Sequence, residues 1–169
     1  MKIKMLKYRS VRSTNDEAIK LIKKNVSSPT IITAARQSRG RGRMGKKWLS
    51  IQGNLFLSIF FEINHKRINF KQYTILNAHL IRQVLSKYSL KKINIKWPND
   101  LLIERKKVCG ILQEVIEHKE KKFIIVGVGI NSVSSPYIKE NKTTCLSKFS
   151  NKKVVNSKIL KDIIKTYKK

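Results

Sequence analysis

The chain contains little cysteine, the residue that cross-links small secreted proteins, and little proline. It has two cysteines and three prolines in 169 residues. Cys109 and Cys145 have neither the spacing of metal ligands nor the density of a disulfide scaffold, so we expect two buried, reduced thiols. No stretch reaches the roughly 20 apolar residues that span a bilayer, and residues 1–6 lack the features of a signal peptide. We therefore expect a cytoplasmic protein without a membrane segment.

Acidic residues are also scarce. Asp and Glu number 10 against 38 Lys and Arg, which gives a formal net charge of +28. Such a charge normally points to a polyanionic partner. However, lysine, isoleucine and asparagine are abundant together, as strongly AT-rich coding would produce, and the lysines show no sharp clustering before the C-terminal tail. Compositional drift and nucleic-acid binding therefore both remain explanations of the charge.

The hydrophobic content of 41% is enough for one domain with a real core, and we expect residues 1–169 to form a single domain. Apolar residues recur at helical intervals in three segments, 15–24, 72–88 and 157–167. The first of these begins directly after Thr14, which together with Glu17 has the spacing of a capping box.

Strand-like segments occupy most of the remaining chain, at 30–35, 54–63, 93–97, 101–103, 107–116 and 123–130. Short connections such as 118–122 indicate antiparallel hairpins, because parallel neighbours need a long crossover. The sequence thus predicts an α+β fold in which a mixed, mostly antiparallel β-sheet packs against helices.

The segment 36–48 combines flexible backbone with a concentration of arginine. Four of the nine arginines lie between positions 36 and 43, interleaved with Gly40 and Gly42 and followed by Gly45. Planar guanidinium groups suit carboxylate and phosphate oxygens, so this loop is typical of one that closes over an anion. A flexible basic hairpin loop without a ligand is the alternative.

The three glycines of this loop also match the pattern G-x-G-x-x-G of dinucleotide-binding proteins. That site needs a helix directly behind the glycines, with the pyrophosphate at its N-terminus. Here Trp48 and a polar turn lead into the strand-like segment 54–61. The context therefore argues against a nicotinamide site.

A second group of polar residues lies at 96–112. Lys96 ends an apolar strand, and Trp97-Pro98-Asn99-Asp100 forms a turn in which proline fixes the backbone. Such a turn can aim Lys96 and Asp100 into a site, although an ordinary turn has the same residues. Gly110 falls inside the next strand, which indicates a close approach by a ligand or another segment, or else a β-bulge.

Taken in order, these segments resemble the catalytic domain of biotin protein ligases, also called biotin–[carboxylase] ligases. The resemblance covers about residues 13–132 and rests on four motifs: Ser13-Thr14-Asn15, Gln37 with the glycine loop up to Trp48, Lys96 to Asp100, and Lys107-x-x-Gly110-Ile111-Leu112 followed by Gly127 to Asn131. It implies the class II aminoacyl-tRNA synthetase/biotin ligase fold. It also implies an enzyme that activates biotin with ATP as biotinyl-5′-AMP and transfers it to a lysine of a biotin carboxyl carrier protein.

The resemblance assigns roles to individual residues. Those expected to bind biotin are Ser13, Thr14, Asn15, Gln37, Gly40, Arg41, Gly110 and Leu112; those expected to bind ATP are Arg41, Arg43, Lys46, Trp48, Lys96 and Asn131; and those expected to act in catalysis are Arg43, Lys96, Asp100 and Lys107. Mg²⁺ is implied together with ATP, but no carboxylate cluster in the sequence marks a metal site built by the protein.

Several relatives of this family carry further domains that we do not expect here. Only 12 residues precede Ser13, too few for a winged helix, so we expect no specific DNA binding, and the chain ends near its last helix, where relatives continue into a small β-barrel. A homodimer is compatible with the resemblance. The rival functions are a lipoate ligase or transferase of the same superfamily and a basic nucleic-acid-binding module.

Overall fold

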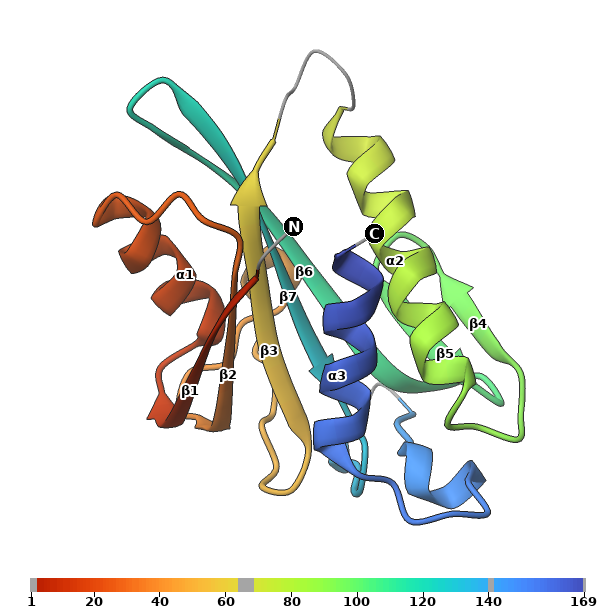
Figure 1. Cartoon of the computed structure of the whole chain (residues 1–169). Helices are drawn as coiled ribbons and strands as arrows, with labels where there is room; N and C mark the ends of the chain where they lie inside the picture. Colours follow the sequence, from red (N-terminus) through yellow and green to blue (C-terminus); the bar gives the residue numbers. More distant parts are fainter. Residues whose placement is uncertain (1–2, 64–68, 140–141, 169) are drawn as a thin grey trace.

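The computed structural model describes residues 3–63, 69–139 and 142–168 and contains one seven-stranded sheet (Figure 1). The strands lie in the order β1-β2-β3-β7-β6-β5-β4. Their bounds are Lys4–Val11 (β1), Thr30–Gln37 (β2), Leu55–Glu62 (β3), Ile93–Lys96 (β4), Asp100–Ile103 (β5), Lys106–His118 (β6) and Lys121–Ile130 (β7). Only β1 and β2 are parallel neighbours, and every other adjacent pair of these strands is antiparallel. The mixed, mostly antiparallel sheet predicted from the sequence is confirmed.

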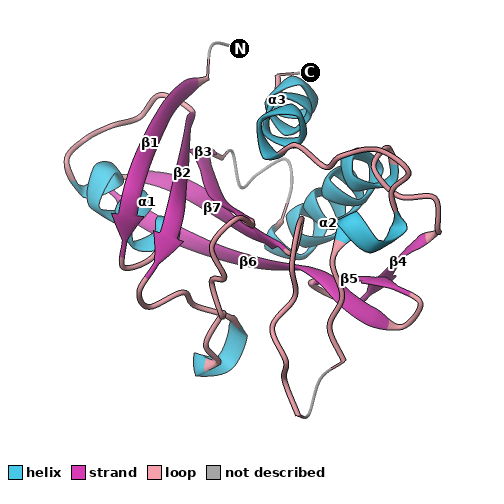
Figure 2. Cartoon of the chain, turned by 90° about the horizontal axis from the view of Figure 1, so that it is seen from below, coloured by secondary structure: helices cyan, strands magenta, loops and turns pink. Residues whose placement is uncertain are grey.

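Three α-helices cover the two faces of this sheet: α1 (Thr14–Lys23), α2 (Phe70–Ser86) and α3 (Asn156–Tyr167). Neighbouring residues of β2 show the alternation, since Ile31 packs with α2 and α3 whereas Ile32 packs with α1. Figure 2 shows α2 and α3 beside each other, away from α1. No helix in the described ranges is both long and apolar enough to cross a membrane.

The sequence analysis did not predict β1. Its inward-facing residues, Leu6 and Tyr8, are only partly buried, and Lys4, Lys7 and Arg9 are exposed. A strand at the edge of a sheet needs little apolar surface, so lysine and arginine dilute its alternating pattern. Pairing with β2 places the end of β1 directly before α1 and beside the glycine loop, because Val11 lies opposite Gln37.

The predicted capping box of α1 is wrong. Ser13 is the N-cap and makes no capping hydrogen bond with its side chain, while Thr14 is already the first helical residue. Thr14 instead donates both its N–H and its hydroxyl toward Gln37 on β2. A capping box does occur at α2, between Asn69 and Gln72, so that helix begins before the predicted position 72.

Both cysteines are free and buried, as expected. Cys109 lies next to an irregularity in the β5–β6 pairing, where Leu101 is opposite Cys109 but Leu102 is opposite Lys107. One residue of β6 is thus bulged out just before Gly110. The bulged residue is Val108, whereas Gly110, for which a bulge was the alternative, pairs regularly with Asp100 and Gly129 and has the close approach described below.

Candidate active site

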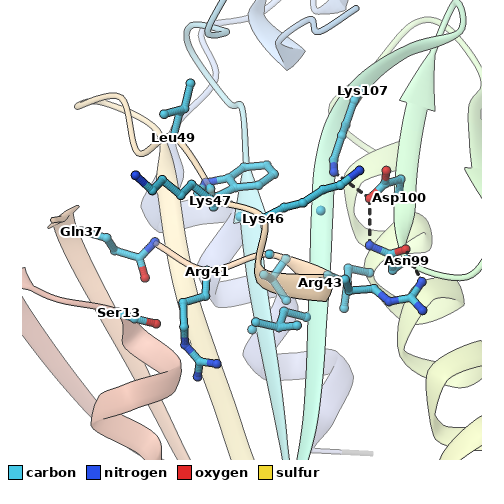
Figure 3. A pocket seen from close by; sticks show the side chains of 18 of the residues that line it. Ser13, Gln37, Arg41, Arg43, Lys46, Lys47, Leu49, Asn99, Asp100 and Lys107 are labelled. Carbon is cyan, nitrogen blue, oxygen red and sulfur yellow. Dashed lines mark hydrogen bonds and ion pairs between the residues drawn. The ribbon is translucent and has the colours of Figure 1, made fainter. Parts of the chain in front are cut away.

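A cleft of about 600 Å³ opens between the N-terminus of α1, the glycine loop and the surface of β6 and β7 (Figure 3). This volume lies within the roughly 300–1,000 Å³ of small-molecule sites. The cleft is lined by most of the residues selected from the sequence: Ser13, Thr14, Asn15, Gln37, Arg41, Arg43, Lys46, Trp48, Asp100, Lys107, Gly110, Leu112 and Asn131. Segments as far apart as residues 13 and 131 therefore meet at one site.

Two of the selected residues, Gly40 and Lys96, do not line the cleft. Gly40 is buried under the loop, and a Cβ there would lie 2.6 Å from the backbone oxygen of Trp48. Lys96 is exposed at the end of β4, opposite Asp100 in the strand register. Its side chain lies at the margin of the site, and its assignment to catalysis stays a prediction.

Buried polar groups form the end of the cleft next to α1, which we call the α1 end. Ser13, Thr14 and Asn15 are each at most 3% exposed. The N–H of Thr14 donates to Gln37 Oε1 at 2.8 Å, and Gln37 Nε2 donates to Ser50 Oγ at 3.1 Å. Side chains held by such contacts keep fixed orientations, so this end can recognise a polar ring.

Arg41 lies near the start of the glycine loop, where its guanidinium group is paired with two carboxylates. Its Nη1 and Nη2 donate to the two carboxylate oxygens of Glu114 at 2.8 and 2.7 Å, and its Nε lies 2.9 Å from Asp16 Oδ1. The hydrogen bond to Glu114 is the main cause that raises the pKa of Arg41. The two carboxylates therefore hold the guanidinium group of Arg41 in one orientation beside α1.

Glu114 and Asp16 were not selected from the sequence. The signal for Glu114 was present, because residues at alternate positions of a strand share one face. Gly110, Leu112 and Glu114 lie on β6 at this spacing, and the first two were already assigned to the site. Asp16 lies in the first turn of α1 and could be found only from the fold.

Arg43 connects the glycine loop to the turn that follows β4. Its Nη1 donates to Asn99 Oδ1 at 3.0 Å, and Asn99 Nδ2 donates to Asp100 Oδ1 at 3.0 Å. The same Asp100 oxygen lies 2.8 Å from Lys107 Nζ (Figure 3). This chain brings two predicted cations and the predicted carboxylate together, and Asn99 is the member that the sequence analysis left out of the site.

Trp48 forms a wall of the cleft by lying on two glycines of the sheet. A Cβ at Gly110 would lie 2.7 Å from Cζ3 of the indole, and one at Gly129 would overlap the ring. Lys107 Nζ lies 5.4 Å from the centre of the ring, within the range of a cation–π contact. The sequence analysis predicted a close approach at Gly110, and the approaching group is this indole.

Apart from Arg41 Nε, which is paired with Asp16, two buried polar atoms at the cleft have no hydrogen-bond partner within the described part of the chain. They are Trp48 Nε1 and Asn131 Oδ1, a donor and an acceptor. A buried group without a partner costs free energy, so such atoms commonly mark places where a ligand or water completes the bonding. Both residues were predicted to bind ATP. Among the described residues, no three His, Cys, Asp or Glu side chains are grouped to hold a metal ion.

The fold is that of the class II aminoacyl-tRNA synthetase/biotin ligase type, with its cleft on the exposed surface of the central strands. Residues 8–131 match the model of the Biotin/lipoate A/B protein ligase family, and the chain belongs to that family. These findings confirm the resemblance proposed from the motifs.

Individual relatives agree. The chain is 31% identical over 163 residues to the bifunctional ligase/repressor BirA of Bacillus subtilis, covering 93% of this chain and 50% of that protein. It is 31% identical over 127 residues to the biotin–[acetyl-CoA-carboxylase] ligase of Paracoccus denitrificans, covering 73% and 52%. The chain thus spans about half the length of the curated relatives it matches.

Among solved structures, the biotin protein ligase of Aquifex aeolicus in complex with biotin and ATP superposes with a TM-score of 0.80 at 32% identity, covering 98% of this chain and 68% of that one. A lipoate protein ligase of Thermoplasma acidophilum superposes with a TM-score of 0.64 but only 9% identity. The latter likeness shows the shared fold alone.

Proposed function

We propose that this chain activates biotin with ATP to form biotinyl-5′-AMP and transfers the biotinyl group to a lysine of a carrier protein of a biotin-dependent carboxylase. The observation that carries the proposal is the series of side-chain contacts from Arg43 through Asn99 and Asp100 to Lys107. These contacts bring cations from two distant segments to one cleft. The biotin- and ATP-bound relative of similar fold supports the choice of substrates.

The cleft has a separate place for each part of these substrates. The buried polar groups of the α1 end suit the ureido ring of biotin, which carries both N–H donors and a carbonyl acceptor. At the opposite wall, Trp48 offers a flat face and Asn131 a free acceptor, which suit an adenine base. The reacting groups would then meet between these two ends.

The chemistry at that meeting point joins two anions. The biotin carboxylate attacks the α-phosphorus of ATP, and the bond from that phosphorus to the pyrophosphate oxygen breaks. Arg43, Lys46 and Lys107 line the cleft and would offset the repulsion of the reactants. A preorganised group of this kind is typically worth about 3–4 kcal/mol of barrier. Lys96 would join them from the margin of the site.

The described residues suit Mg²⁺ only as a companion of the nucleotide. They offer Asp100 at the cleft but no grouped set of carboxylates, and Asp100 is paired with Lys107. An ion that arrives with the triphosphate needs few protein ligands and would neutralise phosphate charge.

In the second half-reaction the ε-amine of the carrier lysine attacks the acyl carbon of biotinyl-5′-AMP, and AMP leaves. Asp100 would position this amine, because its carboxylate stands at the cleft, held by Asn99 and Lys107. The particular carrier, a homodimeric assembly and a cytoplasmic location are parts of this proposal, and binding to a specific DNA sequence is not.

The decisive experiment is incubation of the purified chain with labelled biotin, ATP, Mg²⁺ and an acceptor carrier domain. We expect labelled carrier, and no transfer when labelled lipoate and its own acceptor domain replace biotin. Transfer of lipoate alone would overturn the choice of substrate, and no transfer of either would overturn the proposed activity.

Lys96 and Lys92, both exposed in the described structure, provide a matched pair of variants. Arg43→Ala and Lys96→Ala should keep the fold but reduce biotin-dependent ATP–pyrophosphate exchange by a factor of about a hundred or more. Lys92→Ala removes another exposed lysine four positions before Lys96 and should leave exchange unchanged. Normal exchange in Lys96→Ala would remove that residue from the reaction.

A further inference from the structure

A line of buried hydrogen bonds runs beneath the α1 end of the cleft, and one of its members, Ser58, has no assigned role. Ser58 lies in the middle of β3 and is completely buried. Its Oγ lies 2.7 Å from Thr14 Oγ1 and 2.5 Å from Asn15 Oδ1. The absence of a side chain at Gly127 makes room for this arrangement, because a Cβ there would overlap the Asn15 amide.

The charge of Glu114 sets the direction of these hydrogen bonds. Asn15 Nδ2 donates to Glu114 Oε2 at 2.7 Å and lies 3.4 Å from the backbone oxygen of Leu112. Both neighbours are acceptors, so the amide nitrogen must face them and Asn15 Oδ1 must face Ser58. Because Oδ1 can only accept, the single hydroxyl proton of Ser58 goes to Asn15. Ser58 can then only accept from Thr14.

The proton of Thr14 is fixed in turn. Its hydroxyl has two neighbours, Ser58 Oγ at 2.7 Å and Gln37 Oε1 at 3.1 Å. Gln37 presents its oxygen here, because the same atom accepts the Thr14 N–H and the amide nitrogen donates to Ser50. Both neighbours are acceptors, so the Thr14 proton points into the protein. The lone pair that remains makes Thr14 an acceptor toward the cleft.

We propose that Ser58 is a specificity-determining positioning residue, which with Asn15 and Glu114 fixes Thr14 as an acceptor and so selects a ring that carries an N–H donor. This inference rests on the proposed function, in which that ring is the ureido ring of biotin. A ring without N–H, such as the dithiolane of lipoate, would leave the buried acceptor unpaired. Sites built to bond a particular polar group reject ligands that lack it far more strongly than apolar pockets can.

The test compares biotin with the two cyclic carbamates in which one or the other ureido N–H is replaced by oxygen. Binding of each to the intact chain is measured by calorimetry. The chain should reject one carbamate, the one whose oxygen faces Thr14, by a factor of about ten or more in Kd. In Ser58→Ala the Thr14 hydroxyl loses its nearer acceptor and keeps only the longer contact to Gln37 Oε1, at 3.1 Å, so it can turn and donate to the ring oxygen of that carbamate instead. The preference for biotin over this carbamate should then fall to within about threefold, while the preference over the other carbamate stays and KM for ATP is unchanged.

Two further variants separate this role from a loss of packing. Thr30→Val removes another completely buried hydroxyl, which donates to Ser28 at the far end of β2, and should change neither preference. Glu114→Gln leaves Ser58 in place but allows the Asn15 amide to turn, so it should weaken the same preference as Ser58→Ala.

The outcomes distinguish this inference from the proposed function. Unchanged discrimination in both Ser58→Ala and Glu114→Gln would overturn the role of Ser58 while biotin binding stood. An equal loss of preference over both carbamates would also overturn it, since it would indicate general loosening of the α1 end. Failure of the unaltered chain to bind biotin at all would instead refute the proposed function, before any variant is compared.

Discussion

Gly129→Ala tests whether the wall formed by Trp48 is needed for the nucleotide. The added methyl group would overlap the indole ring. The backbone cannot yield easily, because Gly129 pairs with Phe56 on β3 and with Gly110 on β6 in the middle of the sheet. The indole is only half-buried and borders the cleft, so it is the group that has to move.

The expected effect on the free energy of unfolding is small. Overpacking a core typically costs about 1–3 kcal/mol, and we expect the lower end of this range because the indole can swing toward solvent. The effect on the affinity for ATP should be easier to detect. A base stacked on an aromatic side chain gains about 1–3 kcal/mol, so removing the wall should weaken ATP binding by a factor of about ten.

A double-mutant cycle with Trp48→Ala provides the assay. ATP affinity is measured by calorimetry and stability by urea unfolding for both single variants and the double variant. If Gly129→Ala acts only by displacing the indole, it should have little further effect on ATP binding once the indole is gone. Additive losses in the double variant would refute this reasoning, because they would mean that the methyl group obstructs the nucleotide directly.

Three further predictions follow from other residues. Asp100→Asn should leave biotinyl-5′-AMP formation near normal but slow transfer to the carrier by a factor of about a hundred, measured by single-turnover transfer from the isolated adenylate, and equal transfer rates would contradict the positioning role. Burial and the hydrogen bond to a carboxylate raise the pKa of Tyr88 from its ordinary value of 10.0 to about 12. The protonated Tyr88 therefore contributes its full share of stability below about pH 10, its unfolded pKa, and this share is lost as the pH rises through about 12, its folded pKa. Tyr88→Phe should flatten this decline in urea unfolding followed against pH, whereas an unaltered curve would contradict the assignment. Burial also raises the pKa of Cys109, and Cys145 is buried as well. A thiol reagent at mildly alkaline pH should therefore label neither cysteine in the folded chain but both in guanidinium chloride. Rapid labelling without denaturant would contradict the burial of these thiols.

The parts of the fold that could be predicted are those with strong local periodicity. All three helices and the strands from β2 onward lie close to their predicted positions because their apolar faces meet a core. β1 escaped prediction because an edge strand buries little and carries cations. The capping residues of α1 were misread because the Thr14 hydroxyl serves a tertiary contact to Gln37, which no local pattern reveals.

The same distinction applies to the site. Motif residues line the cleft because glycine loops and strand-end turns are marked by sequence. Glu114 could have been found from strand alternation with Gly110 and Leu112. Ser58 could not, because a serine in an apolar strand has no signal until α1 is placed against β3. Sequence reasoning therefore finds the groups that would touch a ligand more readily than those that orient them.

Arg41 and Arg43 stand two positions apart but are held with very different strength. The first is bonded to two carboxylates, whereas the second reaches only the neutral amide oxygen of Asn99. An incoming carboxylate or phosphate would compete poorly for Arg41 but easily for Arg43, because Arg41 already has two anionic partners whereas the partner of Arg43 carries no charge. The glycine loop is therefore held firmly at Arg41 and only weakly at Arg43. Ligand binding can thus rearrange the part of the loop around Arg43 without disturbing the polar end of the cleft beside α1.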